Sequence, residues 1–207
     1  MRNAIKRFFF DEKTYSIGIA IEVILICVVL FCDYYAATLD MFSLFEIAIR
    51  TVLIIGLFRA YKRENLFLMN GIIAGLLFCI LYREANHVLG ELMTLSVDKF
   101  IMMGYRGSLY LCISMAILFL ECVMVYNHFA ISAHHIDGIT KLAVNEISTI
   151  MLFAMLLVQI LSNFFLDLNY WMIASFVCTT FAEGVLFVVI GHCDLMIAID
   201  REEANEK

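Results

Sequence analysis

Ionisable side chains occur inside several long apolar runs of this 207-residue chain. At bilayer depth such a residue costs at least ~2.5 kcal/mol on insertion scales, so each one needs a partner or a role. These residues are Glu22, Glu46, Arg50, Glu121, Glu183, His192 and Asp194. Glu46 and Arg50 are one helical turn apart, which allows a self-neutralising ion pair, with a ligand or gating site as the alternative. Three glutamates each lie alone near the middle of a run: Glu22, Glu121 and Glu183. We interpret them as protonated carboxyls that form a hydrogen bond with a neighbouring helix.

A stripe of small and polar side chains follows one face of the last apolar run. Ser175, Thr179 and Glu183 repeat at one-turn intervals, and Gln159 and Asn163 make a similar pair in the run before it. We expect these two helices to share a polar seam, with Glu183 facing the bundle and Gln159 as its nearest neighbour. Such stripes mark close helix packing, and they can equally line a small cavity.

The histidines and cysteines do not have the spacing of a metal site or a disulfide framework. The seven Cys all lie inside or at the ends of apolar runs, without a C-x-x-C, and are interpreted as small core residues. His128 precedes His134 and His135 by about one heptad, but no Cys or carboxylate at a suitable spacing completes a ligand set. His192 and Asp194 are two residues apart, so they lie on different faces of a helix. We predict no metal and no cofactor.

Composition places the chain among helical membrane proteins. Apolar residues make up 63% of it, charged residues only 16%, and the mean hydropathy is +0.92. Soluble domains have about 45–50% apolar and about 25% charged residues. A domain of this size keeps much of its surface wet, so it cannot bury such an excess. The long unbroken apolar runs do not alternate as the strands of a transmembrane barrel do.

The sequence also argues against two function classes, enzymes and nucleic-acid-binding proteins. We find no G-x-S-x-G, H-E-x-x-H, Walker or paired-acid protease motif, so the sequence does not predict an enzyme. The net charge is -6 and there is no basic patch with interleaved aromatics, which argues against nucleic acid as a partner.

Six runs approach or reach the ~20 apolar residues that a membrane helix needs. The predicted fold is therefore all-α: a polytopic membrane protein with a six-transmembrane-helix bundle in one domain over 1–207. The spans are Tyr15–Tyr35, Met41–Tyr61, Leu66–Tyr82, Ser108–Phe129, Val144–Leu166 and Trp171–Ile199.

The segments between and around the spans complete the expected topology. Ten Lys and Arg fall on the side of both termini and three on the other, which predicts cytoplasmic termini, including the segment 1–14. Residues 84–107 mix charged and apolar positions, as an amphipathic helix on the outer interface would. No glycine or proline follows Leu195, so one continuous helix is expected from Trp171 to Glu203, with 200–207 leaving the membrane.

The C-terminal half of the chain resembles a family of bacterial membrane modules. A histidine-rich loop leads to the string from Lys141 to Ile147, then to a span with Gln159, an outer turn ending in Tyr170-Trp171, and a final span closing on a charged segment. This layout resembles the six-helix N-terminal membrane sensor modules of GGDEF diguanylate cyclases and histidine kinases. There is no proline in the outer turn and no output domain in the sequence.

That resemblance implies a sensory or signal-transducing module of the inner (plasma) membrane, without catalysis of its own. It would pass helix displacement to a cytoplasmic partner or output domain. Its expected partners are the lipid bilayer and either a second copy in a homo-oligomer or a cytoplasmic signalling protein. The alternative is an oligomeric small-solute or ion transporter or channel.

Overall fold

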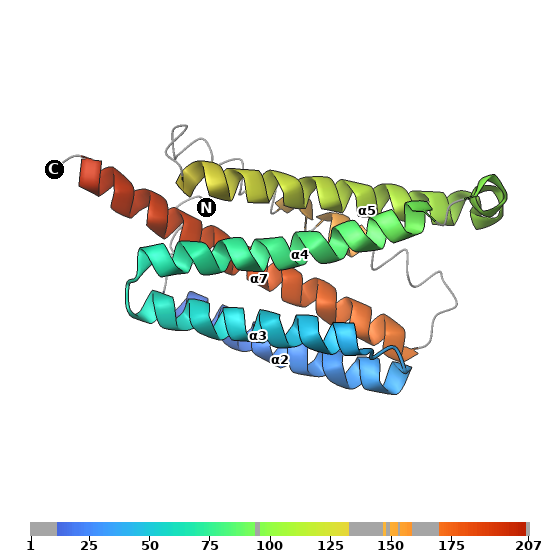
Figure 1. Cartoon of the computed structure of the whole chain (residues 1–207), viewed down its shortest axis with the longest axis horizontal. Coiled ribbons are helices and arrows are strands. Elements are labelled where there is room, and N and C mark those ends of the chain that lie inside the picture. Colours follow the sequence, from blue (N-terminus) through green and yellow to red (C-terminus); the bar gives the residue numbers. More distant parts are fainter. Residues whose placement is uncertain are drawn as a thin grey trace.

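The computed structural model describes residues 12–93, 96–132, 147, 150–152, 154–158 and 170–205. In these residues all regular secondary structure is helical. The helices are α2 (Glu12–Ala36), α3 (Met41–Lys62), α4 (Leu66–Met93), α5 (Val97–Ser132) and α7 (Tyr170–Asn205). Each of these five is long and apolar enough to cross a membrane. Figure 1 shows them as long rods lying along one common direction.

Short turns join the first three helices and set them antiparallel. Asp40 caps α3, because its Oδ1 accepts a hydrogen bond from the Ser43 backbone N–H at 2.7 Å. At the other end of α3, Glu64 adopts a positive φ of 51° and the Asn65 N–H donates to the Ala60 carbonyl at 3.0 Å. The Asn65 side chain then accepts from the Leu68 N–H at 3.0 Å and starts α4. The turns therefore bring the end of α2 beside the start of α3, and the end of α3 beside the start of α4.

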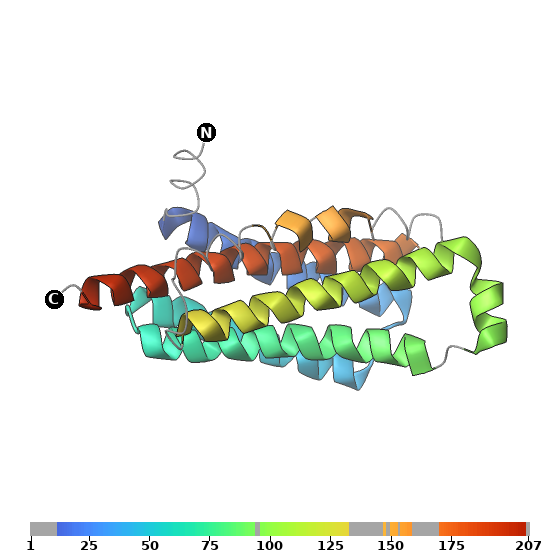
Figure 2. The ribbon, with the colours of Figure 1, turned by 90° about the horizontal axis from the view of Figure 1, so that it is seen from above.

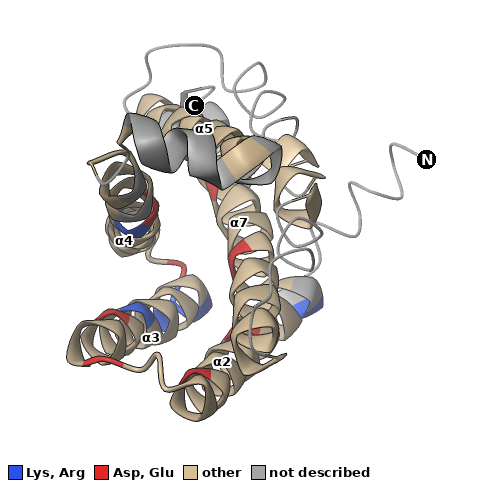
Figure 3. Cartoon of the chain, turned by 90° about the vertical axis from the view of Figure 1, so that its right-hand side faces the viewer, with Lys and Arg blue, Asp and Glu red and all other residues tan. Residues whose placement is uncertain are grey.

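Packing divides the bundle into two layers. α2 packs along α7, whereas α4 lies between α3 and α5. Contacts that join the two layers, from α2 to α3 and from α7 to α4 and α5, are much fewer. Gly18 permits the close approach of α2 to α7, because a Cβ there would lie 2.9 Å from Val189 Cγ2. Viewed from the end, α3 and α4 lie on one side and α2 and α7 on the other, and charged residues occur in several of the helices (Figure 3).

The apolar core lies where the layers meet, and much apolar surface stays outside it. Ile54, Leu57, Leu76 and Leu186 are completely buried, as are several neighbours. Other large apolar side chains point outward at mid-helix, including Val52, Phe78 and Phe119. The outer face of the bundle is therefore apolar, which a water-exposed surface seldom is.

The helix positions of five predicted spans are confirmed. The first, second, third, fourth and sixth lie within α2, α3, α4, α5 and α7, and α7 is the single continuous helix that the sequence predicts. The fifth span, Val144–Leu166, is described only at residues 147, 150–152 and 154–158, which are helical. The segment 1–11 and residues 206–207 lie outside the described residues.

Residues 84–107 do not form one separate helix, because α4 and α5 each take in part of this segment. No helix-breaking residue follows the third span directly, so α4 continues through Met93 instead of ending near Tyr82. A second helix begins at Val97 and turns at Gly104, whose φ of 62° and ψ of -170° only glycine adopts readily. Figure 2 shows the resulting change of direction at this end of α5. Arg83 and Glu84 consequently belong to a bundle helix, not to an outer connection.

Candidate functional site

Six charged side chains from all five described helices meet between the two layers. We call them the charged cluster: Glu22 of α2, Arg50 of α3, Arg83 and Glu84 of α4, Glu121 of α5, and Glu183 of α7. Ion pairs among them join the two layers.

Arg50 joins α3 to both helices of the other layer. Its Nη2 donates to Glu22 Oε1 at 2.7 Å, and both side chains are buried. Its Nη1 lies 3.9 Å from Glu183 Oε1. The predicted self-neutralising pair of Arg50 with Glu46 is wrong, because the guanidinium points toward α2 and α7. Glu46, on the preceding turn, lines a cavity instead.

Arg83 makes the second link between the layers. Its guanidinium contacts the carboxylate of Glu183 and lies 3.2 Å from Glu84 Oε1. Neither Arg83 nor Glu84 was predicted as a site residue, because the third span was expected to end near Tyr82. The signal was present: helix formers continue beyond Tyr82, and the next glycine is Gly90.

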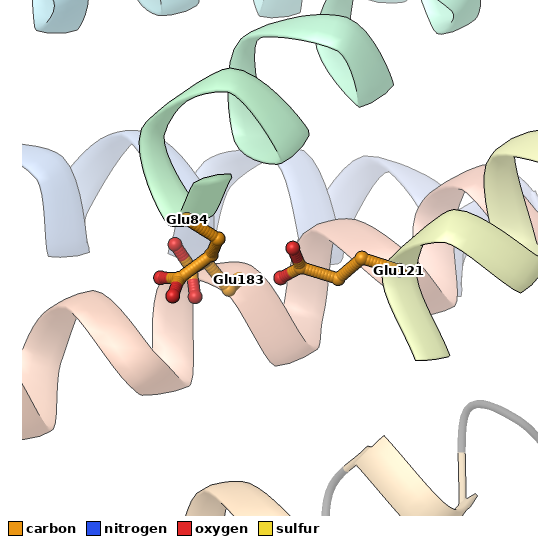
Figure 4. A group of neighbouring side chains, drawn as sticks. All are labelled: Glu84, Glu121 and Glu183. Atoms are coloured by element: carbon orange, nitrogen blue, oxygen red, sulfur yellow. The ribbon is translucent and has the colours of Figure 1, made fainter. Parts of the chain in front are cut away.

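Glu121 differs from the other members of the charged cluster. It is buried, and neither of its carboxylate oxygens has a hydrogen-bond partner among the described residues. One carboxylate oxygen from each of three glutamates, Glu84, Glu121 and Glu183, lies within 4.8 Å of the other two. Figure 4 shows the Glu121 side chain pointing at the other two.

A cavity of about 160 Å³ lies beside the charged cluster. Asp33, Ser43 and Glu46 line it near the α2–α3 turn, and Arg50 and Arg83 line it deeper in the bundle. Thr179 and Ala182 complete its wall on α7. Guanidinium groups bind carboxylates and phosphates, and carboxylates bind cations, so both ends of this cavity can hold charged groups of a small ligand.

The polar stripe of α7 has three different environments. Ser175 is buried and donates a hydrogen bond to Asp33 of α2. Thr179 donates to the Ser175 carbonyl at 2.9 Å and lines the cavity, and Glu183 is buried in the charged cluster. Gln159 and Asn163 lie outside the described residues, so the expected neighbour of Glu183 is not located; Arg83 and Arg50 contact it instead.

A second polar region lies nearer the other end of the bundle. Tyr15 and Tyr61 stack with ring centroids 3.9 Å apart, and His192 Nε2 lies 3.4 Å from the Tyr61 hydroxyl. His128 Nδ1 lies 2.6 Å from Asp194 Oδ1, and both residues are buried. We call these five residues the histidine–tyrosine layer. His192 and Asp194 have different partners, as expected for residues on different faces of one helix.

Comparison of the sequence with protein-family models, with curated proteins and with solved structures finds no match. The resemblance to bacterial sensor modules therefore stays a prediction.

Proposed function

We propose that the chain spans a membrane as a helical bundle with both termini on the cytoplasmic side. Five described helices of sufficient length and hydropathy support this, as do the apolar side chains on their outer faces. The buried position of the charged cluster supports it too, because lipid-facing charges would be too costly. Basic residues on the side of the termini support the orientation.

Cysteine labelling in intact cells tests this topology. In a variant without native cysteines, a membrane-impermeant maleimide should reach single cysteines at positions 37 and 169 from outside. It should reach positions 62 and 205 only after the membrane is permeabilised. Labelling of position 62 from outside would overturn the orientation.

We further propose that the chain is a sensory, signal-transducing module without catalysis of its own. One observation carries this proposal: α7 is a continuous helix that lines the cavity, takes part in the charged cluster and reaches Asn205. A small charged ligand in the cavity would meet Arg50 and Arg83, and both contact Glu183 of α7. Re-pairing of these side chains would shift α7 against its neighbours, and shifts of about 1–2 Å are sufficient in known helix switches.

Distance measurements between spin labels test the coupling of the cluster to α7. Labels at Arg59→Cys in α3 and Met196→Cys in α7 report on the end of the bundle away from the cavity, in protein reconstituted into lipid. Arg50→Gln should shift or broaden the distance distribution, because it removes one of the two guanidinium groups that contact Glu183. Glu46→Gln is the matched control, since it lines the same cavity without pairing to Arg50. An unchanged distribution in Arg50→Gln would contradict the proposal.

The second candidate is an oligomeric ion or small-solute transporter or channel. Glu121 favours it, because a buried carboxyl without a partner is typical of ion and proton pathways. Proteoliposomes loaded with a pH- or ion-sensitive dye separate the two candidates. Sustained flux that Glu121→Gln abolishes would favour the transporter.

A further inference from the structure

The carboxyl of Glu121 needs an explanation beyond helix packing. Its residue is 2% exposed, and both of its oxygens lack a partner among the described residues. It faces two more carboxylates, Glu84 and Glu183, which approach from other helices (Figure 4). Like charges at this separation repel strongly in a medium of low dielectric.

The charge of the cluster favours the binding of a cation. Four carboxylates, those of Glu22, Glu84, Glu121 and Glu183, share the site with the two guanidiniums of Arg50 and Arg83. If all six are ionised, the cluster carries two uncompensated negative charges. Buried uncompensated charge is among the most destabilising features that a bundle can hold.

We propose that Glu84, Glu121 and Glu183 form a binding site for a hard divalent cation such as Mn²⁺, Mg²⁺ or Ca²⁺. Carboxylate oxygens are the ligands that these ions prefer. The three ligands come from α4, α5 and α7, so an ion would join both layers of the bundle. Two positive charges would also neutralise the cluster. The assignment depends on these side chains alone and holds for a sensor or a transporter.

Arg83 is the built-in competitor of this ion. Its guanidinium contacts Glu183 and Glu84, two of the three proposed ligands. Its side chain is 25% exposed and lines the cavity, so it has space to move aside. Cation binding would therefore free the Arg83 guanidinium toward the cavity, where an anionic group could meet it.

Binding of Mn²⁺ to the purified full chain in lipid nanodiscs tests the site. Bound Mn²⁺ loses the electron paramagnetic resonance signal of the free aqueous ion, so the titration gives affinity and stoichiometry directly. We expect one Mn²⁺ per chain, competed by Ca²⁺ or Mg²⁺. Glu121→Gln should weaken binding at least about tenfold, the factor typical of losing a supporting or direct ligand. Glu46→Gln, a cavity-lining glutamate outside the three ligands, should bind as the wild type does.

The Arg83→Gln variant distinguishes a cation site from a cluster with a purely structural role. Removing the competing guanidinium should tighten Mn²⁺ binding, whereas loss of a merely structural ion pair would leave it unchanged or weaker. If Glu121→Gln does not fold, Glu121→Asp and Arg83→Gln decide the question. Absence of Mn²⁺ binding to the wild type at millimolar concentration, or equal binding by Glu121→Gln, would overturn the site. Greater stability of Glu121→Gln without any Mn²⁺ binding would overturn it in favour of a neutral, protonated Glu121.

Discussion

The charged cluster and the histidine–tyrosine layer both bury polar side chains between the same helices, but they are built differently. In the histidine–tyrosine layer, Asp194 pairs with His128. The rings of Tyr15 and Tyr61 stack on each other beside the apolar core. In the cluster, carboxylates outnumber guanidiniums, one carboxyl has no partner among the described residues, and a cavity adjoins it. In the first arrangement the buried acid and base are matched one to one. The second leaves binding capacity unused, so we expect ligand effects at the cluster and stability effects alone at the layer.

Arg50→Met should have the largest effect on stability. It leaves Glu22 buried without its ion-pair partner, and breaking a buried pair costs about 3–5 kcal/mol. Unfolding by increasing SDS fraction in mixed micelles measures this loss. Arg59→Met is the control, because Arg59 is exposed on the same helix and should change stability by less than about 0.5 kcal/mol. Combining Arg50→Met with Glu22→Leu should recover much of the loss, and equal losses in single and double variants would contradict the pairing.

Asp194→Leu should have the second largest effect on stability, and it should distinguish the histidine–tyrosine layer from the charged cluster. It leaves the buried His128 Nδ1 without its 2.6 Å partner, which costs about 1–3 kcal/mol. The same unfolding titration measures this cost. The double variant with His128→Phe should be more stable than Asp194→Leu alone, because no polar group is then left unpaired. Mn²⁺ binding should stay at the wild-type affinity; a large change would mean that the layer and the cluster are one site.

The sequence predicted the helices well because apolar length and charge distribution are local properties. Five of the expected spans coincide with described helices, and the continuity of α7 follows from the absence of breakers beyond Leu195. The sequence could not predict where α4 ends, because the amphipathic pattern after Tyr82 suits an interfacial helix as well as the end of a bundle helix.

Most of the site residues were recognised individually, whereas their partners were not. Burial cost alone marks Glu22, Arg50, Glu121 and Glu183 as significant. Pairing depends on how the helices pack: Glu46 is the nearest acid to Arg50 in sequence, yet Glu22 on another helix is the partner. His128 and Asp194 likewise meet across α5 and α7, which no local spacing reveals.

Tyr61→Phe should have a smaller effect and sharpens the description of the layer. It removes the hydroxyl near His192 Nε2 but keeps the ring that stacks on Tyr15. A neutral hydrogen bond contributes about 0.5–1.5 kcal/mol, and this one is long at 3.4 Å, so the loss should be near the lower value. Tyr61→Leu should lose a further ~0.5–1.5 kcal/mol with the aromatic pair. Tyr82→Phe, at an exposed tyrosine, is the control in the same unfolding assay; an equal loss there would contradict a specific role for the Tyr61 hydroxyl.

Asp40→Ala should have the smallest effect, at a surface outside both regions. Hydrogen bonds from Ser43, first from its side chain and then from its backbone N–H, stabilise the charged carboxylate at the start of α3 and lower the pKa of Asp40 below its ordinary value. A lowered pKa in the folded state means that the charged cap stabilises the protein fully above the unfolded pKa of about 4. That stabilisation is lost as pH falls through the folded value. The unfolding midpoints of wild type and Asp40→Ala should therefore differ slightly at pH 7 and converge as the pH is lowered. Asp40→Asn, which can still accept the hydrogen bond, should remain close to the wild type at pH 7. A difference between these midpoints that grows on acidification would contradict the capping role of Asp40. It would mean that packing alone stabilises the start of α3.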